Sequence, residues 1–225
     1  MVLPILTHNR VASWQFYPLG DTALLAQAPA DDPLANQVAL SLARRLEANP
    51  PPGFIAAVPA IDTLLVCFEP LLSSHAALAA HLLTLLADPA PPMHTAGRLI
   101  EVPVRYGGDH GPDLETVAAQ LGLSPAEVVA LHSDRPLPVL MIGFAPGYAY
   151  LGGLPLALHL PRRATPRSAV PAGSVAIAAG MTGIYPARLP GGWHLIGQTA
   201  IVLFDPAADP PALLRPGDSV RFVAL

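Results

Sequence analysis

The sequence predicts an α+β protein in which a small α/β domain is followed by a mainly β domain. Three observations support this fold class. Segments with strand and helix character alternate over residues 14–87, and a Pro-rich stretch, DPAPPMHTAG, follows at residues 88–97. From residue 141 to residue 199, Gly and Pro separate short apolar runs, a composition that suits tight turns between short strands. We therefore expect two domains, residues 1–90 and residues 91–225.

The order of elements in the first domain is close to βαββα. Strands are expected at WQFYPLG, ALLAQA, FIAAVPA and TLLVCFE, with helices over residues 33–48 and 71–87. In the first helix apolar residues recur every four positions from Leu34 to Leu46, the pattern of a helix that packs one face on a sheet. No group of residues in this domain forms a convincing catalytic constellation.

The second domain begins with the strand RLIEVPVRY and continues with a short helical insertion, VAAQLGLSPAEVVALH, that resembles a helix-turn-helix. Ser124 suits an N-cap, Pro125 the first helical position, and Glu127 completes a capping box. The second helix carries a Glu and no Arg, so it offers neither phosphate attraction nor a reader of bases. We therefore predict two capped structural helices.

The composition excludes several classes of function. The chain has a formal net charge of -4 and 12 basic residues, all of which are Arg. Without Lys there is no Walker A loop, no Schiff-base lysine and no site for biotin attachment. Since the acidic balance lacks the basic patch that nucleic acid requires, we expect no nucleic-acid partner.

No segment predicts a membrane span or a metal site. Apolar runs stay short of the roughly 18 to 20 residues that cross a bilayer. The N-terminus lacks the pattern of a signal peptide, so we expect a cytoplasmic protein with no membrane partner. The single cysteine, Cys67, excludes an internal disulfide and a cysteine-based zinc cluster. The motifs GxSxG, HExxH, CxxC and GxGxxG are absent.

Three segments of the second domain carry a resemblance to a known family. They are GFAPGYAYLGGLP, PRRATPRSAVPAGSVAIAAGMTGIYP and PGGWHLIGQT, and together they resemble the family of 5-oxoprolinase B subunits. That family also contains the sporulation histidine-kinase inhibitor and allophanate hydrolase subunit 1. Shorter matches at PLGDTALL, LLVCFEP, PVRYGGDHGPDL and LLRPGDSVRF extend the resemblance over nearly the whole chain.

The resemblance implies a cyclophilin-like β-barrel as the second domain and a role in an ATP-dependent 5-oxoprolinase, which opens 5-oxo-L-proline to L-glutamate. It implies two partners, a homologous barrel protein that is the C-type component of 5-oxoprolinase and a third component. ATP, with Mg, would be used by the complex, and the chain alone would be inactive. Two alternatives stay open: an inhibitor that binds a sensor histidine kinase, and a subunit of an allophanate- or urea-degrading amidohydrolase.

Polar and aromatic residues among the turns are the candidate site residues. Arg167 and His132 are the candidate catalytic residues. Arg167 could present its guanidinium fork to a substrate carboxylate, and Arg162 could do the same, the alternative being a surface salt bridge. His132 suits an acid or base near neutral pH, and equally a cap at the end of its helix. The expected substrate-binding residues, which core packing would also explain, are Phe144, Tyr148, Arg162, Thr182, Tyr185 and Trp193.

Asp113 stands in the turn sequence GGDHGPD, where hydrogen bonds within the turn explain an Asp without catalysis. Three positions depart from the family pattern: Met181 replaces a typical Gln, Leu189 a Ser and Gln198 an Arg. If Met181 removes an amide from the substrate cleft, the departure bears on activity rather than on fold.

Overall fold

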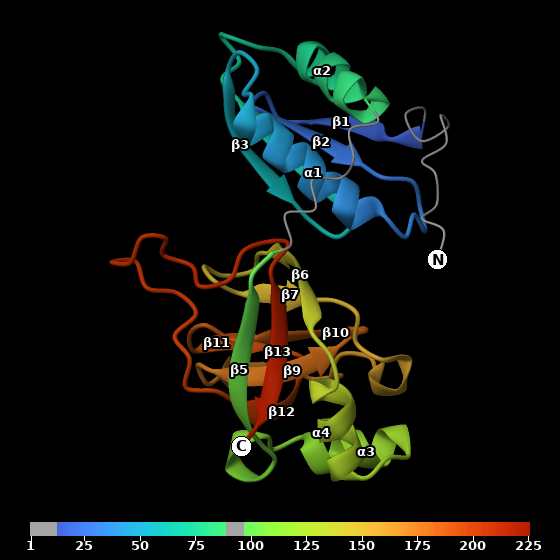
Figure 1. The fold of residues 1–225 in the computed structure, drawn as a ribbon, viewed down its shortest axis with the longest axis vertical. Coiled ribbons are helices and arrows are strands. Elements are labelled where there is room, and N and C mark those ends of the chain that lie inside the picture. The colour runs from blue at the N-terminus through green and yellow to red at the C-terminus, as the bar shows by residue number, and fades with distance from the viewer. Residues whose placement is uncertain (1–12, 89–96) are drawn as a thin grey trace. The chain divides into compact units, whose positions relative to one another are not determined.

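The computed structural model describes residues 13–88 and 97–225. The chain divides into two compact units, residues 1–95 and residues 96–225, which are described separately below. Figure 1 labels their helices and strands in chain order.

The first unit is a four-stranded antiparallel sheet with two helices, in the order ββαββα. Its elements are β1 (Gln15–Leu19), β2 (Ala23–Gln27), α1 (Ala35–Ala48), β3 (Phe54–Pro59), β4 (Thr63–Phe68) and α2 (His75–Ala87). The strands pair in the order β1-β2-β4-β3. Each predicted strand and helix is confirmed. Helix α2 begins four residues later than expected because Ser74 caps it, its hydroxyl accepting a hydrogen bond from the Ala77 amide at 3.2 Å.

Both helices pack on one face of this sheet. Every second residue of β4 is buried beneath them, while its other residues are only half-buried. In α1 the buried stripe contains Leu42 and Leu46, as predicted, but Ala35, Ala39 and Ala43 replace the expected leucine and valine positions. Small side chains let the helix backbone lie close to the sheet, and periodicity of large apolar residues alone does not reveal this.

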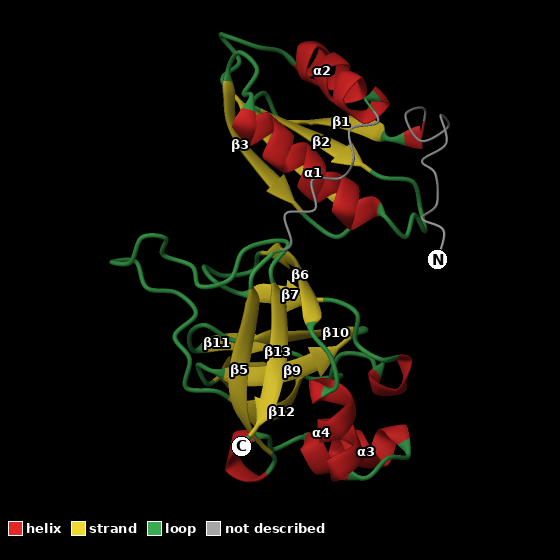
Figure 2. Cartoon of the chain, viewed as in Figure 1, coloured by secondary structure: helices red, strands yellow, loops and turns green. Residues whose placement is uncertain are grey.

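The second unit is a closed barrel with a small accessory sheet. The barrel strands are β5 (Leu99–Tyr106), β6 (Leu137–Ile142), β7 (Ala149–Leu151), β9 (Ser174–Ala178), β10 (Met181–Ile184), β12 (His194–Gln198) and β13 (Ser219–Ala224). They pair in the order β10-β7-β6-β13-β5-β12-β9, which closes because β9 also pairs with β10. Strands β8 (Arg167–Val170) and β11 (Leu189–Gly191) form a separate pair. Figure 2 shows that strands, joined by long loops, make up most of the regular structure of this unit.

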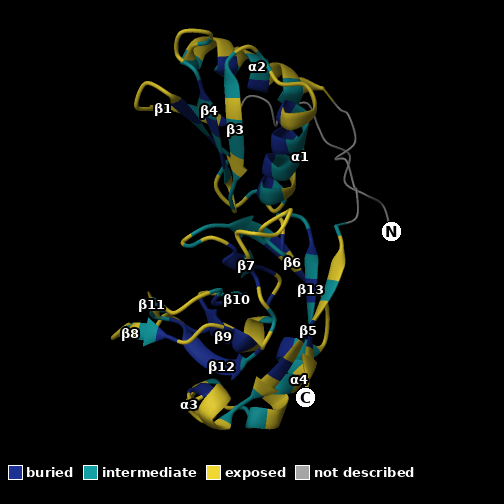
Figure 3. Ribbon diagram, turned by 90° about the vertical axis from the view of Figure 1, so that its left-hand side faces the viewer, coloured by how far each residue is buried: buried dark blue, intermediate teal, exposed yellow. Residues whose placement is uncertain are grey.

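Closure depends on residues that are far apart in the chain. Strands β5 and β13 lie parallel, with Leu99 opposite Ser219. Asp218, which is buried, accepts hydrogen bonds from the Arg98 amide at 3.0 Å and from the Arg98 guanidinium at 2.6 Å. This ion pair fixes where the two strands begin. Strand β9 is buried throughout and β12 is buried except for its last residue, and Figure 3 shows both mainly in dark blue.

Two short helices, α3 (Leu114–Leu121) and α4 (Pro125–Ser133), follow the 3-10 turn η2 (Gly108–His110). Gly122 ends α3 in the left-handed region, with φ 69°. Ser124 and Glu127 form the predicted capping box, which is thereby confirmed. A second 3-10 turn, η3 (Leu156–Leu158), precedes the segment that carries the arginines. Across residues 13–88 and 97–225, no helix combines the length and apolar character that crossing a membrane requires.

Candidate functional site

An aromatic cavity of about 180 Å³ lies on the second unit, within the segments that carry the family resemblance. It opens to solvent and combines tyrosine, tryptophan and phenylalanine walls with two arginines. We call it the aromatic cavity. Its lining consists of Phe144, Tyr148, Tyr150, Arg162, Arg163, Pro166, Tyr185, Pro190, Gly191, Gly192 and Trp193. The structure therefore brings together every predicted substrate-binding residue except Thr182.

Tyr148 is the centre of the aromatic wall. Its ring meets those of Phe144, Tyr185 and Trp193 edge to face, with centroid distances of 5.4, 5.2 and 6.1 Å. Tyr150 lies 4.9 Å from the same ring. These contacts make the wall a single packed unit, so its parts hold fixed positions around the opening.

Two glycines make room for the tyrosine hydroxyls. A Cβ at Gly191 would lie 2.1 Å from the Tyr185 hydroxyl oxygen, and a Cβ at Gly183 would lie 2.8 Å from that of Tyr148. Any larger residue would displace the wall, which explains why glycine occupies these positions. Burial raises the pKa of both phenols, so they are protonated near neutral pH.

Phe144 stands at the rim in a strained backbone conformation. Its φ is 66°, a value that non-glycine residues rarely adopt. The Ala145 amide donates to the Gly143 carbonyl at 2.7 Å, closing a three-residue turn around Phe144. Its side chain is 59% exposed although it is apolar. Strain of this kind persists where the surrounding structure fixes it, and it is concentrated at functional sites.

Arg162 is held between two anchored neighbours. His194 donates from Nε2 to the Pro161 carbonyl at 3.0 Å, and the Arg163 amide donates to the Gly192 carbonyl at 2.8 Å. Within the described part of the chain, the Arg162 guanidinium has no hydrogen-bond or ion-pair partner. Arg162 therefore brings to the cavity a positive charge that no described carboxylate pairs with.

Arg167 was predicted to bind a substrate carboxylate, but its guanidinium binds a carboxylate of this chain. Its Nη1 and Nη2 each donate to an Asp113 carboxylate oxygen at 2.8 Å. Arg163 adds a third hydrogen bond at 3.0 Å, and the Leu195 amide a fourth at 2.7 Å. A bidentate pair between Arg167 and a carboxylate was predicted, but with a substrate and not with Asp113. Arg167 does not line the aromatic cavity.

Asp113 is thus the residue that sequence reasoning missed. Interpreted as a turn residue, it is in fact 5% exposed and joins the start of α3 to β8 and β12. Burial alone would raise its pKa, but hydrogen bonds from Arg167 and Leu195 and the charges of Arg167 and Arg163 lower it overall. No feature of the sequence near Asp113 signals arginines 50 and 54 positions away.

His132 and Thr182 lie together, apart from the aromatic cavity. Thr182 Oγ1 donates to the Ala176 carbonyl at 3.0 Å, so it accepts from His132 Nε2, 2.9 Å away. His132 Nδ1 then accepts from the Tyr106 hydroxyl at 2.7 Å. Burial lowers the pKa of His132 to about 3, which keeps the ring neutral. Both ring nitrogens have internal partners, so the side chain neither caps its helix nor reaches the cavity.

The three departures from the family pattern also lie outside the cavity lining. Met181 and Leu189 are half-buried and pack against the aromatic cluster from behind. Gln198 links two turns: its Oε1 pairs with His110 Nδ1 at 2.9 Å, and its Nε2 donates to the Ala172 carbonyl at 3.0 Å. The amide that Met181 replaces would therefore not line this cavity.

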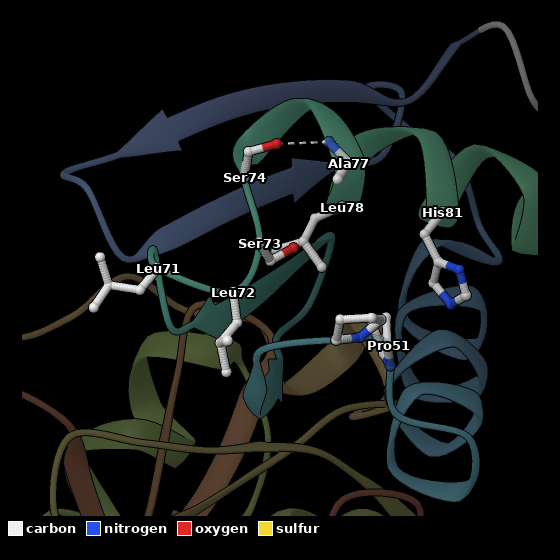
Figure 4. A pocket seen from close by; sticks show the side chains of 9 residues that line it. Pro51, Leu71, Leu72, Ser73, Ser74, Ala77, Leu78 and His81 are labelled. Carbon is white, nitrogen blue, oxygen red and sulfur yellow. Dashed lines mark hydrogen bonds between the residues drawn. The ribbon is translucent and has the colours of Figure 1, made fainter.

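A larger hollow, of about 460 Å³, lies on the first unit between α2 and the turn after α1. Figure 4 shows Ser74 capping α2 above it, with Leu72, Pro51 and His81 around it. Leu71 and Leu72 beside it are 91% and 68% exposed. Its lining holds one ionisable side chain, His81, and no arginine or carboxylate. Although it is larger, this hollow is lined by fewer charged and aromatic side chains than the aromatic cavity.

Comparison with known proteins identifies the family. The profile of the carboxyltransferase domain, subdomain C and D, matches residues 14–214. A relative from Escherichia coli O157:H7, the B subunit of its 5-oxoprolinase, is 46% identical over 211 residues, covering 92% of this chain and 94% of its own. The chain belongs to the family of 5-oxoprolinase B subunits. A second member of the family, the 5-oxoprolinase B subunit of Bacillus subtilis (strain 168), is 39% identical over 223 residues, covering 94% of this chain and 93% of its own.

Solved structures agree with this assignment. TTHA0988 superposes with a TM-score of 0.79 at 40% identity, covering 90% of this chain, which spans only 39% of that longer chain. PH0987 from Pyrococcus horikoshii gives 0.56 at 39% identity, covering 94% and 97%. The K. lactis urea amidolyase gives 0.73 at 17% identity, covering 100% and 15%, and at that identity it shows the fold alone. The predicted α+β class with a C-terminal barrel is confirmed.

Proposed function

We propose that this chain is the B subunit of an ATP-dependent 5-oxoprolinase, which hydrolyses 5-oxo-L-proline to L-glutamate. The observation that carries the proposal is alignment over nearly the whole length, at 46% and 39% identity, with two relatives named for that role. The family's strongest sequence segments form the aromatic cavity, where we place the substrate-binding residues Phe144, Tyr148, Arg162, Tyr185 and Trp193. We place the complex in the cytoplasm.

The cavity suits a small ligand. Its volume of about 180 Å³ is below the roughly 300 to 1,000 Å³ of sites for drug-sized molecules. Aromatic walls beside a cation match a small ring that carries an anionic group. A five-membered lactam with a carboxylate has both features. We propose that the aromatic wall orients this ring and excludes water from its faces.

The described residues offer neither a P-loop nor a protein-only metal site for ATP and Mg. The chain has no Lys for a P-loop. Residues 13–88 and 97–225 hold no cluster of three or more His, Cys, Asp and Glu that could bind a metal ion. The hydrolysis of an unstrained lactam gains from coupling to ATP, so we assign nucleotide binding to the partners: the homologous barrel protein that is the C-type component of 5-oxoprolinase, and a third component.

Two residues predicted to be catalytic receive other roles in this proposal. Asp113 occupies the Arg167 fork, and Tyr106 and Thr182 occupy both nitrogens of His132. We propose that both residues support the barrel behind the cavity and do not touch substrate. The reacting groups would then come from the assembled complex, which is why we expect the isolated chain to be inactive.

Reconstitution of the complex tests this function. The measurement is glutamate release from 5-oxo-L-proline, with and without ATP, by the three-component mixture, by the mixture lacking this chain, and by this chain alone. We expect release only from the complete mixture with ATP. Equal release without this chain, or no release from a verified complex, overturns the proposal.

One observation favours a second candidate. Phe144 is 59% exposed at the rim of the aromatic cavity, where it could anchor a protein as well as a small molecule. An inhibitor of a sensor histidine kinase would use such a residue. This second candidate function predicts that the chain binds a kinase dimerisation domain, that Phe144→Ala weakens the binding, and that 5-oxo-L-proline does not affect it.

A further inference from the structure

Three arginines lie close together in the sequence segment PRRATPR, and the structure gives them different partners. Arg163 and Arg167 share the buried carboxylate of Asp113. Arg162 lines the aromatic cavity and has no partner within the described part of the chain. Its charge acts on the pKa values of Tyr148 and Tyr185, which it lowers against the larger effect of burial, so it lies near the aromatic wall. Arg163 also lines the cavity, but one of its guanidinium nitrogens is bound to Asp113 and its Nε is buried without a partner. Of the three guanidinium groups, that of Arg162 is the one that is not bound to a carboxylate of the described chain.

The backbone on both sides of Arg162 is fixed by the two residues that flank Trp193 of the aromatic wall, His194 and Gly192. His194 is 6% exposed on β12, next to Trp193, and donates to the Pro161 carbonyl at 3.0 Å. On the other side, the Arg163 amide donates to the Gly192 carbonyl. Trp193 and Arg162 are therefore held by the same two-sided attachment. Arg162 loses little backbone entropy on binding a ligand, because its neighbours are already ordered.

We propose that Arg162 is the carboxylate receptor of the aromatic cavity and that His194 positions it through the Pro161 carbonyl. The ligand class is a small ring bearing a carboxylate. A guanidinium offers a carboxylate two parallel hydrogen bonds, and such charge-assisted pairs are stronger than neutral ones. The identity of the ligand as 5-oxo-L-proline rests on the function proposed above, whereas the assignment of Arg162 rests on the cavity alone.

The chain supplies an internal probe for this inference. It has two tryptophans, of which Trp193 lines the cavity and Trp14 is buried in the core of the first unit. Indole resonances of the ¹⁵N-labelled full chain, assigned with Trp14→Phe, report each site separately. The two ligands compared are 5-oxo-L-proline and 2-pyrrolidone, the same ring without the carboxylate. We expect 5-oxo-L-proline to shift the Trp193 resonance saturably, leave Trp14 unchanged, and bind at least about tenfold more tightly than 2-pyrrolidone.

Arg162→Gln should weaken 5-oxo-L-proline binding by about 10- to 100-fold, because a hydrogen-bonded charge pair is lost. It should leave 2-pyrrolidone binding unchanged. The matched control is Arg135→Gln, whose side chain is exposed and pairs with Asp134, and which should bind both ligands as the natural chain does. Equal affinity for the two ligands, no shift of Trp193 with 5-oxo-L-proline, or an Arg162→Gln variant with unchanged affinity overturns the inference.

Two variants separate positioning from folding at His194. His194→Leu removes the donor to Pro161 and should weaken only the carboxylate ligand, while His194→Gln keeps a donor and should restore most of the affinity. A purely structural role would weaken both ligands equally in both variants. Such a result would overturn the positioning role.

Activity of the complex distinguishes this inference from the proposed function. Glutamate release with an unchanged KM for 5-oxo-L-proline in Arg162→Gln overturns the inference and leaves the function standing. Carboxylate binding that depends on Arg162, in a chain whose verified complex releases no glutamate, supports the inference and overturns the function.

Discussion

The aromatic cavity and the polar clusters behind it use similar residue types in opposite ways. Around Asp113, two arginines share the hydrogen bonds of one carboxylate, and around His132 both ring nitrogens have a partner. At the cavity, Arg162 has no such partner among the described residues, and Phe144 is exposed in a strained turn. Chemical type alone therefore does not mark a site in this barrel. The cavity differs from these clusters because its Arg162 guanidinium makes no hydrogen bond to a described residue and its Phe144 ring is exposed.

The largest expected effect comes from breaking the Asp113 cluster. Asp113→Ala leaves two arginines and the Leu195 amide without their acceptor, so we expect the free energy of unfolding to fall by about 3 kcal/mol. Denaturant unfolding of the full chain measures it. Asp109→Ala, an exposed residue in the same GGDHGPD segment, is the matched control and should change stability by less than about 0.5 kcal/mol.

The Asp113 cluster also has a pH signature. The pKa of Asp113 is lowered in the folded state, so its stabilisation is present above the unfolded pKa of about 3.9 and is lost as pH falls through the lower folded value. The stability difference between the natural chain and Asp113→Ala should therefore shrink only in strong acid. A difference that disappears near neutral pH would contradict the assignment.

His132 should make stability depend on pH in a higher range. Its pKa falls from 6.5 to about 3 on folding, so the unfolded chain binds the proton first. Stability is full above the unfolded pKa and declines as pH falls below it, with a slope approaching about 1.4 kcal/mol per pH unit. The slope between pH 6 and pH 4, compared with that of His132→Gln, isolates the effect. Replacing the exposed His110 by Gln should leave the slope unchanged, and equal slopes in all three chains would argue against a neutral buried His132.

At position 144 we expect a glycine variant to be more stable than an alanine variant, the reverse of the usual order. Because its φ is 66°, Phe144→Gly should be more stable than Phe144→Ala by about 1 kcal/mol, while both weaken binding at the aromatic cavity. Thermal unfolding and the Trp193 resonance measure the two effects. Ala145→Gly, one residue later and without positive φ, should instead destabilise the chain by about 0.5 to 1 kcal/mol. The same order of stabilities at both positions would show that the Phe144 turn carries no strain.

The smallest effect is expected at Met181. Met181→Gln restores the residue typical of the family, yet position 181 does not line the aromatic cavity. We expect affinity for 5-oxo-L-proline to change by less than about twofold, since a ligand in the cavity would not contact the new amide. A larger gain in affinity would mean that the ligand extends beyond the cavity lining.

Interactions between residues that are close together in the sequence determine many local features of this protein. Short-range physics sets the capping box of Ser124 and Glu127 and the strand and helix order of the first unit, and each was predicted. The aromatic lining was also predictable, because Phe144, Tyr148, Tyr185 and Trp193 stand in the segments where Gly and Pro impose turns. Such features depend on neighbours within a few residues, which a sequence displays directly.

The tertiary structure alone decided which polar residues are available. Arg162 and Arg167 cannot be told apart in the sequence PRRATPR. In the structure Asp113, 54 positions before Arg167, accepts hydrogen bonds from the Arg167 guanidinium, whereas the Arg162 guanidinium lines the aromatic cavity. Thr182 likewise meets His132 across 50 positions. A guanidinium or an imidazole is available to a ligand or acts as a support according to whether a distant group satisfies its hydrogen bonds. For Asp113 the pairing of β5 with β12 decides this, because the segment that follows β5 then lies beside Leu195 and Asp113 exchanges hydrogen bonds with it.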